Sequence, residues 1–352
     1  MQTGPWTDDE PLECTMVIPE APNVWTFAFR APSGAWFDYR PGQFVTLDVP
    51  VPGGTLSRTY TISSTPSRPL ALSITAKAQA DSVATRWMAD NLRPGMRIGA
   101  HGPAGGFTLP ENPRGRKFLL VSAGSGITPM MSMLTYIWDY GDRPDVRLIS
   151  CARRPSELIF RHRLEAMARR VPGLRVSYVV GEEEDHEVWT GYLGRFNQLM
   201  LGLMAPDYLE REVYCCGPES FMQSVRDMLN ALGYDMAHYH QESFHAPART
   251  LADQPAIDDV VPQREQTAEI GFSRSGVTLG CTETDTVLGI ARAESLGIPF
   301  GCTFGVCGTC KIRKLSGEVH MVHNGGISDE DVAEGYILAC CAHPIGKVVV
   351  DA

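Results

Sequence analysis

The stretch KFLLVSAGSGITPMMSMLTYIWDY, residues 117–140, changes pattern around a glycine-containing loop. Residues 117–123 form a short apolar run typical of a buried strand, and residues 128–140 have the length and apolar content of a helix. The same alternation continues along the chain, with strand-like runs at 146–152, 174–180 and 212–216 and helix-like segments at 155–170 and 219–233. Strands that alternate with helices predict an α/β domain with a doubly wound parallel sheet.

The residues before this stretch follow a different period. Apolar and aromatic side chains alternate with polar ones at residues 24–29 and 44–49, which indicates half-buried strands. Glycine and proline recur between these short runs, as they do at the turns of small antiparallel barrels. The N-terminal part is therefore predicted to be a closed antiparallel β-barrel.

The C-terminal part begins after a segment rich in Pro, Asp, Ala and Gln, which has neither helical nor strand period. Residues 267–280 then have the pattern of a hairpin and residues 286–297 that of a short helix. We predict a barrel domain at 1–112, an α/β domain at 113–244, a linker at 245–266 and a small third domain at 267–352.

Composition narrows the class of protein. The chain has 352 residues and a formal net charge of -10, which argues against binding to a nucleic-acid backbone. No run approaches the roughly 18 apolar residues of a membrane span, and the N-terminus lacks the pattern of a signal peptide. We therefore expect a cytoplasmic protein without membrane contact. Since that compartment keeps thiols reduced, its ten cysteines favour a metal site over disulfides.

Four cysteines have the spacing of an iron–sulfur site. In FGCTFGVCGTCKIRK, residues 300–314, Cys302, Cys307 and Cys310 follow the pattern C-x4-C-x2-C, and Cys340 is a candidate fourth ligand. This spacing is that of plant-type [2Fe-2S] ligation, in which soft thiolates bind iron. A zinc site is the alternative, but it usually pairs two C-x2-C or histidine motifs. Spacing alone does not decide between Cys340 and its neighbour Cys341.

Two further motifs indicate nucleotide cofactors. In RTYT, Arg58 to Thr61, a cation for a phosphate and an aromatic ring for a flavin can share one strand face, although an exposed polar strand would look the same. In GSGITP, Gly124 to Pro129, we expect Thr128 to cap the following helix and Pro129 to occupy its first turn. The helix N–H groups would then be free for a pyrophosphate.

Together these motifs resemble the ferredoxin-NADP reductase superfamily, and specifically bacterial flavoprotein reductases with a C-terminal plant-type ferredoxin domain of β-grasp fold. RTYT resembles the family's flavin strand, GSGITP its nicotinamide-nucleotide loop, and CCGPESFM, residues 215–222, its C-G-P motif. The resemblance implies Cys216, Glu242 and Phe244 as catalytic residues. It implies cofactor binding by Arg58, Thr59, Tyr60, Thr61, Thr75, Lys77, Thr85, Gly124, Gly126, Thr128, Pro129, Arg153, Gly217 and Pro218, and cluster ligation by Cys302, Cys307, Cys310 and Cys340.

The resemblance also indicates which flavin and which nicotinamide nucleotide the chain binds. FMN-using relatives with this domain order tend to carry a G-G-S-R segment after the flavin strand, where this chain has ADSVATR, residues 80–86. FAD is therefore expected. NADH is expected as the donor, and NADPH is left open because Arg153 could meet a 2′-phosphate.

The predicted activity is that of an NADH-dependent reductase that passes electrons through FAD to a [2Fe-2S] cluster and on to a terminal oxygenase or other redox protein. A Rieske-type monooxygenase or demethylase is the first expected partner. Alternative partners are a hybrid-cluster protein and a multicomponent hydroxylase. Alternative functions of the chain itself are those of a redox-sensing regulator and of an electron carrier with no nicotinamide activity.

Overall fold

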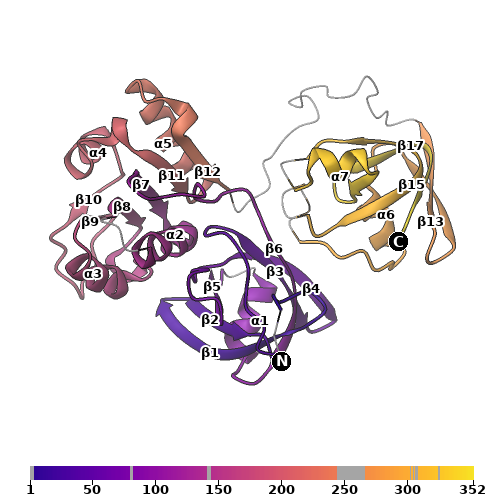
Figure 1. Ribbon diagram of the computed structural model, residues 1–352, viewed down its shortest axis with the longest axis horizontal. Helices are drawn as coiled ribbons and strands as arrows, with labels where there is room; N and C mark the ends of the chain where they lie inside the picture. The colour runs from indigo at the N-terminus through magenta and orange to yellow at the C-terminus, as the bar shows by residue number, and fades with distance from the viewer. Residues whose placement is uncertain are drawn as a thin grey trace.

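Three sheets, each with its own core, make up the molecule (Figure 1). The computed structural model describes residues 4–79, 82–140, 144–243, 266–301, 303, 305, 308–323 and 326–352. The sheets lie within the three predicted ranges, whereas the exact domain boundaries stay a prediction. Most of the expected linker, 245–265, lies outside the described residues.

The first sheet is an antiparallel barrel. Its two end strands meet through a bridge between Ile62 and Ile74, which closes the sheet. Side chains that alternate along the strands fill the interior, as the sequence pattern predicts, and Ala84 and Met88 of helix α1 (Val83–Asn91) pack against them. The strand order is β4 (Gly54–Thr61), β3 (Phe44–Val51), β6 (Arg97–Ala104), β1 (Leu12–Ala21), β2 (Val24–Arg30) and β5 (Leu72–Lys77).

The second sheet is parallel and has helices on both faces. Along β7, Phe118 and Leu120 belong to the cluster with α2 and α3, while Leu119 and Val121 belong to the cluster with α4 and α5. The strand order is β10 (Tyr192–Leu193), β9 (Leu174–Val180), β8 (Asp145–Ala152), β7 (Lys117–Ala123), β11 (Glu212–Cys216) and β12 (Tyr239–Glu242). The helices are α2 (Ile127–Asp139), α3 (Arg161–Arg170), α4 (Gln198–Met204) and α5 (Glu219–Ala231).

One helix is shorter than its sequence pattern indicates. Residues 155–157 form a 3-10 turn, and α3 begins only at Arg161. Phe160 adopts a left-handed φ of 61°, which an α-helix does not tolerate. The expectation of a helix over 155–170 was therefore wrong for its first turn and a half.

The third sheet is mixed and belongs to a small domain. The parallel pair β13 and β17 lies at its centre, and α6 (Val287–Ala293) packs on it through Leu288 and Ala291. The strand order is β14 (Val277–Thr282), β13 (Thr267–Phe272), β17 (Ala342–Val350), β15 (Lys311–Met321) and β16 (Tyr336–Leu338), and α7 (Asp329–Ala333) precedes β16.

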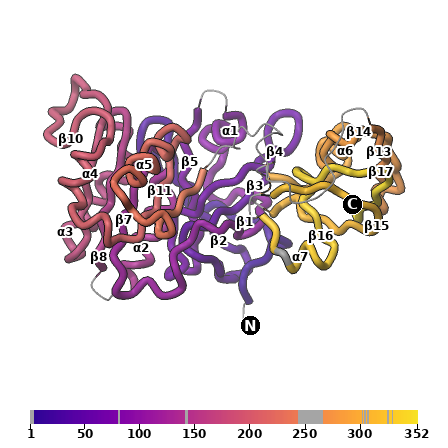
Figure 2. The backbone as a smooth tube through the Cα atoms, turned by 90° about the horizontal axis from the view of Figure 1, so that it is seen from above, coloured from indigo at the N-terminus to yellow at the C-terminus, as the bar shows by residue number. Residues whose placement is uncertain are grey.

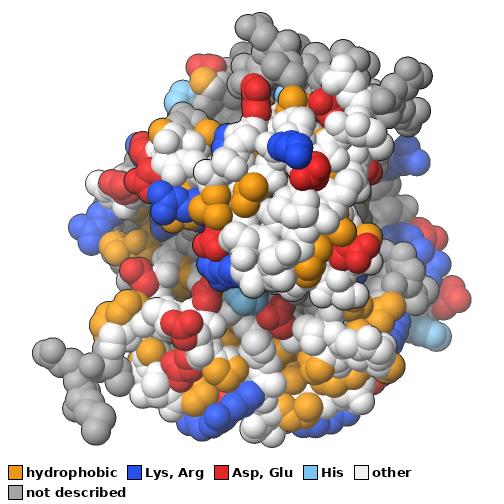
Figure 3. Space-filling model, turned by 90° about the vertical axis from the view of Figure 1, so that its right-hand side faces the viewer, with side chains coloured by type: hydrophobic (Ala, Val, Ile, Leu, Met, Phe, Trp, Pro, Cys, Tyr) orange, Lys and Arg blue, Asp and Glu red, His pale blue; other side chains and the backbone are white. Residues whose placement is uncertain are grey.

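The barrel lies between the other two domains (Figures 1 and 2). On the face of the molecule that Figure 3 presents, acidic and basic side chains are interspersed, so the net negative charge is not gathered in one region of this view. Among the described residues, no helix is long and apolar enough to cross a membrane.

Candidate functional site

The first part of the site lies where the parallel sheet changes direction. Strands β7 and β11 are neighbours, but the chain leaves β7 toward β8 and β9 on one side and leaves β11 toward β12 on the other. Ligands bind at the carboxyl ends of strands at such a switch point. The loops after these two strands are Gly124–Gly126 and Gly217–Pro218, so the fold brings both predicted nucleotide motifs together.

The two glycine loops fit each other without space for a side chain. A methyl group at Gly126 would overlap the carbonyl oxygen of Cys216, and one at Gly217 would lie 3.0 Å from the Cβ atom of Ala123. Glycine is needed at Gly126 because backbone approaches backbone closely there. A methyl group at Gly217 would instead make tight contacts with the side chains of Ala123 and Phe221. Glycine positions without side chains let a pyrophosphate or a nicotinamide approach the backbone directly.

The prediction that Thr128 caps α2 was wrong. Gly126 is the N-cap residue and offers no side chain, and the Thr128 hydroxyl, inside the helix, donates to the Ser125 carbonyl at 3.0 Å. Pro129 does lie in the first turn, as expected. No side-chain oxygen caps the helix N-terminus, but the Ile127 N–H donates to the Gly124 and Ser125 carbonyls of the 3-10 turn and Pro129 has no N–H. A dinucleotide contact at this helix N-terminus therefore stays a prediction.

A cavity of about 690 Å³ opens beside these loops, and its walls include Gly124, Arg153, Phe196, Pro218 and Phe221. Its size and mainly apolar lining with few charged groups suit a nucleotide.

Carboxylates engage the arginine in this cavity. Arg153 pairs with Glu157 at 2.8 Å and lies 3.7 Å from Glu182, while Lys77 of the barrel reaches Glu157 at 3.0 Å. Lys77 thus joins the two domains, a role distinct from its predicted cofactor contact. Sequence reasoning missed both glutamates. The pairing with Glu157 could have been predicted from its four-residue spacing from Arg153. No sequence pattern indicated Glu182.

Cys216 and Glu242 lie side by side at the ends of β11 and β12. Burial, with a smaller contribution from the Glu242 charge, raises the pKa of the Cys216 thiol well above its ordinary value. Burial also raises the pKa of Glu242 to about 8. Its Oε2 atom has no hydrogen-bond partner among the described residues, so it is a buried polar atom that a bound ligand can satisfy. Phe244, the third predicted catalytic residue, lies outside the described residues.

The raised pKa of Glu242 predicts a pH-dependent stability. The folded state holds this proton up to about pH 8, whereas the unfolded state releases it near pH 4.3, so stability falls as pH rises through that window. Glu242→Gln cannot ionise, and we expect its free energy of unfolding to exceed that of the parent by a few kcal/mol at pH 8 but not at pH 4. Denaturant unfolding of both proteins across this range tests the prediction, with exposed Glu111→Gln as control. A difference that does not change with pH would contradict it.

The flavin strand presents two faces. Tyr60 packs against the barrel core, and its hydroxyl lies 3.0 Å from the Thr85 hydroxyl near the start of α1. Arg58 shares this face by strand alternation, and is exposed. Thr59 and Thr61 have the opposite parity, so the four RTYT side chains do not all face one ligand.

These residues fit a flavin diphosphate. The first turn of α1 contains no acidic residue, and its N-cap Ser82 forms no side-chain cap. Free helix N–H groups and an exposed guanidinium form a suitable donor set for phosphate. Thr75 lies on the outer face of β5, since Leu72 and Ile74 of the opposite parity form the barrel core. Its hydroxyl lies 2.7 Å from that of Thr26 and 2.8 Å from that of Ser63, and its cofactor contact stays a prediction.

Two of the four predicted cluster ligands are described, and the fold brings them together. The backbone N–H of Cys340 donates to Sγ of Cys310 at 3.4 Å, and both residues are buried. The thiol of Cys341 instead donates to the Leu338 carbonyl at 3.7 Å. Thiolates with N–H donors fit an iron–sulfur cluster, and this geometry favours Cys340 over Cys341. Cys302 and Cys307 lie outside the described residues.

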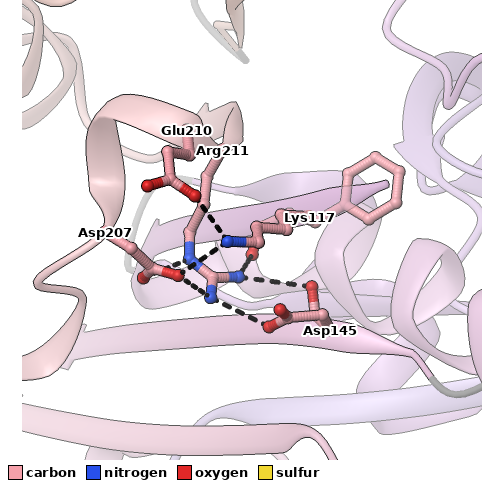
Figure 4. Close-up of polar contacts among 6 residues, drawn as sticks. Lys117, Asp145, Asp207, Glu210 and Arg211 are labelled. Carbon is pink, nitrogen blue, oxygen red and sulfur yellow. Dashed lines mark hydrogen bonds and ion pairs between the residues drawn. The ribbon is translucent and has the colours of Figure 1, made fainter. Parts of the chain in front are cut away.

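A second cluster of charged side chains in the α/β domain lies at the opposite end of the parallel strands (Figure 4). Arg211 is fully buried and pairs with Asp145 at 2.8 Å and Asp207 at 2.7 Å. Hydrogen bonding from Arg211 lowers the pKa of Asp207 to about 2. These residues lie where β7 and β8 begin, away from the glycine loops. We therefore interpret them as structural ion pairs that hold the start of β11 against β7 and β8.

Comparison with known proteins identifies all three domains. The chain matches the oxidoreductase FAD-binding domain family at residues 13–109, the oxidoreductase NAD-binding domain family at 120–227 and the 2Fe-2S iron-sulfur cluster binding domain family at 271–344. The solved structure of phthalate dioxygenase reductase has the same fold, with a TM-score of 0.60 and 23% identity over 99% of this chain and 100% of that one.

Whole-length relatives are more similar in sequence. The stachydrine N-demethylase reductase subunit of Rhizobium meliloti is 60% identical over 99% of this chain and 98% of its own length. The glycine betaine monooxygenase reductase subunit of Pseudomonas aeruginosa is 42% identical over 99% of this chain and 97% of its own.

The fold and site define an NAD-dependent flavin and iron–sulfur oxidoreductase. The chain belongs to the ferredoxin-NADP reductase superfamily, among the oxygenase reductases with a C-terminal [2Fe-2S] domain. The nicotinamide-nucleotide domain argues against a simple electron carrier.

Proposed function

We propose that this protein is the reductase component that carries electrons from NADH to a Rieske-type oxygenase that demethylates a quaternary amine. The observation that carries the proposal is the 60% identity over nearly the whole length of a demethylase reductase subunit. Both described relatives are named for oxygenase systems that act on betaines, stachydrine in one and glycine betaine in the other. No observation favours a hybrid-cluster protein as partner.

The residues of the chain have separate roles in this activity. The bound flavin supplies the conversion between hydride and one-electron chemistry. The two glycine loops bind the dinucleotide close to the backbone, and Cys216 and Glu242 keep their protons at neutral pH because both are buried. Arg58 and the start of α1 hold phosphate, and the cysteines hold the cluster. We also propose a cytoplasmic location, since cluster ligation requires reduced thiols.

The partner can be tested by reconstitution. The purified reductase is combined with a Rieske-type oxygenase that demethylates a betaine, and NADH-dependent release of formaldehyde is measured with stachydrine and with glycine betaine as substrates. We expect oxygen-dependent release from one of these amines. A reductase that reduces ferricyanide but supports no oxygenase of this type would contradict the proposed partner.

NADH rather than NADPH is the proposed donor. Glu182 lies 3.7 Å from Arg153 and 3.5 Å from Arg154, so a 2′-phosphate would meet a carboxylate as well as the two cations. We expect kcat/KM for NADH to exceed that for NADPH by at least about tenfold, or about 1.4 kcal/mol. Glu182→Gln should reduce this ratio, and exposed Glu183→Gln should not. A higher kcat/KM with NADPH in the parent protein would refute the preference.

A further inference from the structure

A threonine on the outer face of the barrel is buried without belonging to the barrel core. Along β3, Val45, Leu47 and Val49 point inward and form part of that core. Thr46 has the opposite parity and therefore points outward, yet it is only 1% exposed. Another part of the molecule must cover it.

The covering residues come from the third domain, in the segment that carries the cysteines. The hydroxyl groups of Thr46 and Thr309 lie 3.1 Å apart. A side chain at Gly301 would begin 3.0 Å from the Thr46 hydroxyl and 3.0 Å from the methyl group of Thr59. Figure 2 shows the third domain beside β3 and β4. Gly301 and Thr309 each adjoin a predicted cluster ligand, Cys302 and Cys310, and Thr59 lies between the predicted flavin residues Arg58 and Tyr60.

The barrel is attached far more firmly to the α/β domain than to the third domain. Phe107 and Leu109 of the segment that leaves the barrel belong to the apolar cluster of the α/β domain, and Arg68 pairs with Asp139 across that interface at 2.8 Å. Among the residues that the structure describes, no ion pair and no shared apolar cluster joins the barrel to the third domain. Small polar side chains and a glycine form the contact, which resembles a transient interface more than a permanent one.

We propose that Thr46 positions the third domain at a docking site on the outer face of β3 and β4 and thereby sets the rate at which this domain receives electrons from the flavin. This inference rests on the proposed function. One electron crosses the contact in each event, so two events discharge the two electrons of one NADH, and the accompanying proton leaves to solvent. Thr46 is a positioning residue: it touches the cysteine segment without being a predicted ligand of flavin, nucleotide or iron.

The test places a bulky cation in the contact. Thr46→Arg should displace the third domain, because Gly301 and Thr309 leave no space for a longer side chain. Stopped-flow mixing of the holoenzyme with NADH should show cluster reduction at least tenfold slower than in the parent. NADH–ferricyanide turnover, flavin content and the cluster's spectrum should stay unchanged. Thr55→Arg, the same substitution at an exposed position of β4, should match the parent in every measurement.

Each outcome bears on the docking site. Unchanged cluster reduction in Thr46→Arg would overturn it. If Thr46→Arg loses flavin or cluster, the test uses Thr46→Val, which removes only the hydroxyl contact. A twofold or greater slowing of cluster reduction in Thr46→Val would support the docking site, and a parental rate would overturn it. If NADH fails to reduce the parent protein at all, the proposed function is refuted. This result differs from a failure of the docking site, in which NADH still reduces the flavin.

Discussion

Replacing Cys340 with alanine should remove the [2Fe-2S] cluster, whereas replacing Cys341 should leave it in place. Cys340 lies beside Cys310, with its N–H directed at the Cys310 sulfur, while the Cys341 thiol is directed at the Leu338 carbonyl. Loss of one of four thiolates should leave the cluster absent or unstable. Visible absorption, iron content and the electron paramagnetic resonance spectrum of the reduced protein measure the effect.

The same pair of variants should separate two activities. In Cys340→Ala, NADH–ferricyanide turnover should survive, because the barrel and α/β domain have their own cores. Cytochrome c reduction, a substitute for transfer to the partner, should fall by at least about tenfold. Cys341→Ala is the matched control and should keep both activities. The reverse pattern, with the cluster lost only in Cys341→Ala, would identify Cys341 as the fourth ligand.

Replacing Gly126 with alanine should abolish most NADH oxidation while FAD and the cluster stay bound. The backbone of Gly126 is right-handed, with φ of -63°, so alanine is not excluded by its torsion angles. Its methyl group would instead overlap the Cys216 carbonyl and push the two nucleotide loops apart. Displacement of a reacting group by about 1 Å can cost about 100-fold in rate, and overpacking typically costs about 1–3 kcal/mol in stability.

Steady-state kcat/KM for NADH, measured with ferricyanide, tests this prediction. Gly202→Ala in α4 is the matched control, since no atom lies near the position of its added methyl group. The control should keep full activity and gain up to about 1 kcal/mol from better helix propensity. A parental kcat/KM in Gly126→Ala would mean that contact between the two loops does not position the nucleotide.

Much of the architecture follows from local patterns. The period-two alternation at residues 24–29, the strand and helix alternation after Lys117 and the C-x4-C-x2-C spacing each depend on residues close together in the chain. Strand faces, buried parallel strands and metal-ligand loops are local requirements of this kind. These patterns were sufficient to predict a barrel, a doubly wound sheet and an iron–sulfur domain in the correct order.

The remaining features depend on contacts between distant residues. A capping threonine and a threonine inside the helix look alike in GSGITP, and only the 3-10 turn at Gly124–Gly126 places Thr128 in the second group. Neighbouring cysteines cannot be told apart by spacing, but the approach of Cys340 to Cys310 separates them.

Burial and charge at the site were likewise set by tertiary packing. The raised pKa of Glu242 arises from its burial at the end of β12 next to β11, and the Glu157 and Glu182 contacts of Arg153 arise from loops at the same sheet edge. The 1% exposure of Thr46 requires a domain that lies more than two hundred residues further along the chain. The sequence by itself therefore determined which elements and cofactor motifs this protein has. Only the tertiary structure decided which side chains meet, because such contacts join residues that have no fixed spacing in the chain.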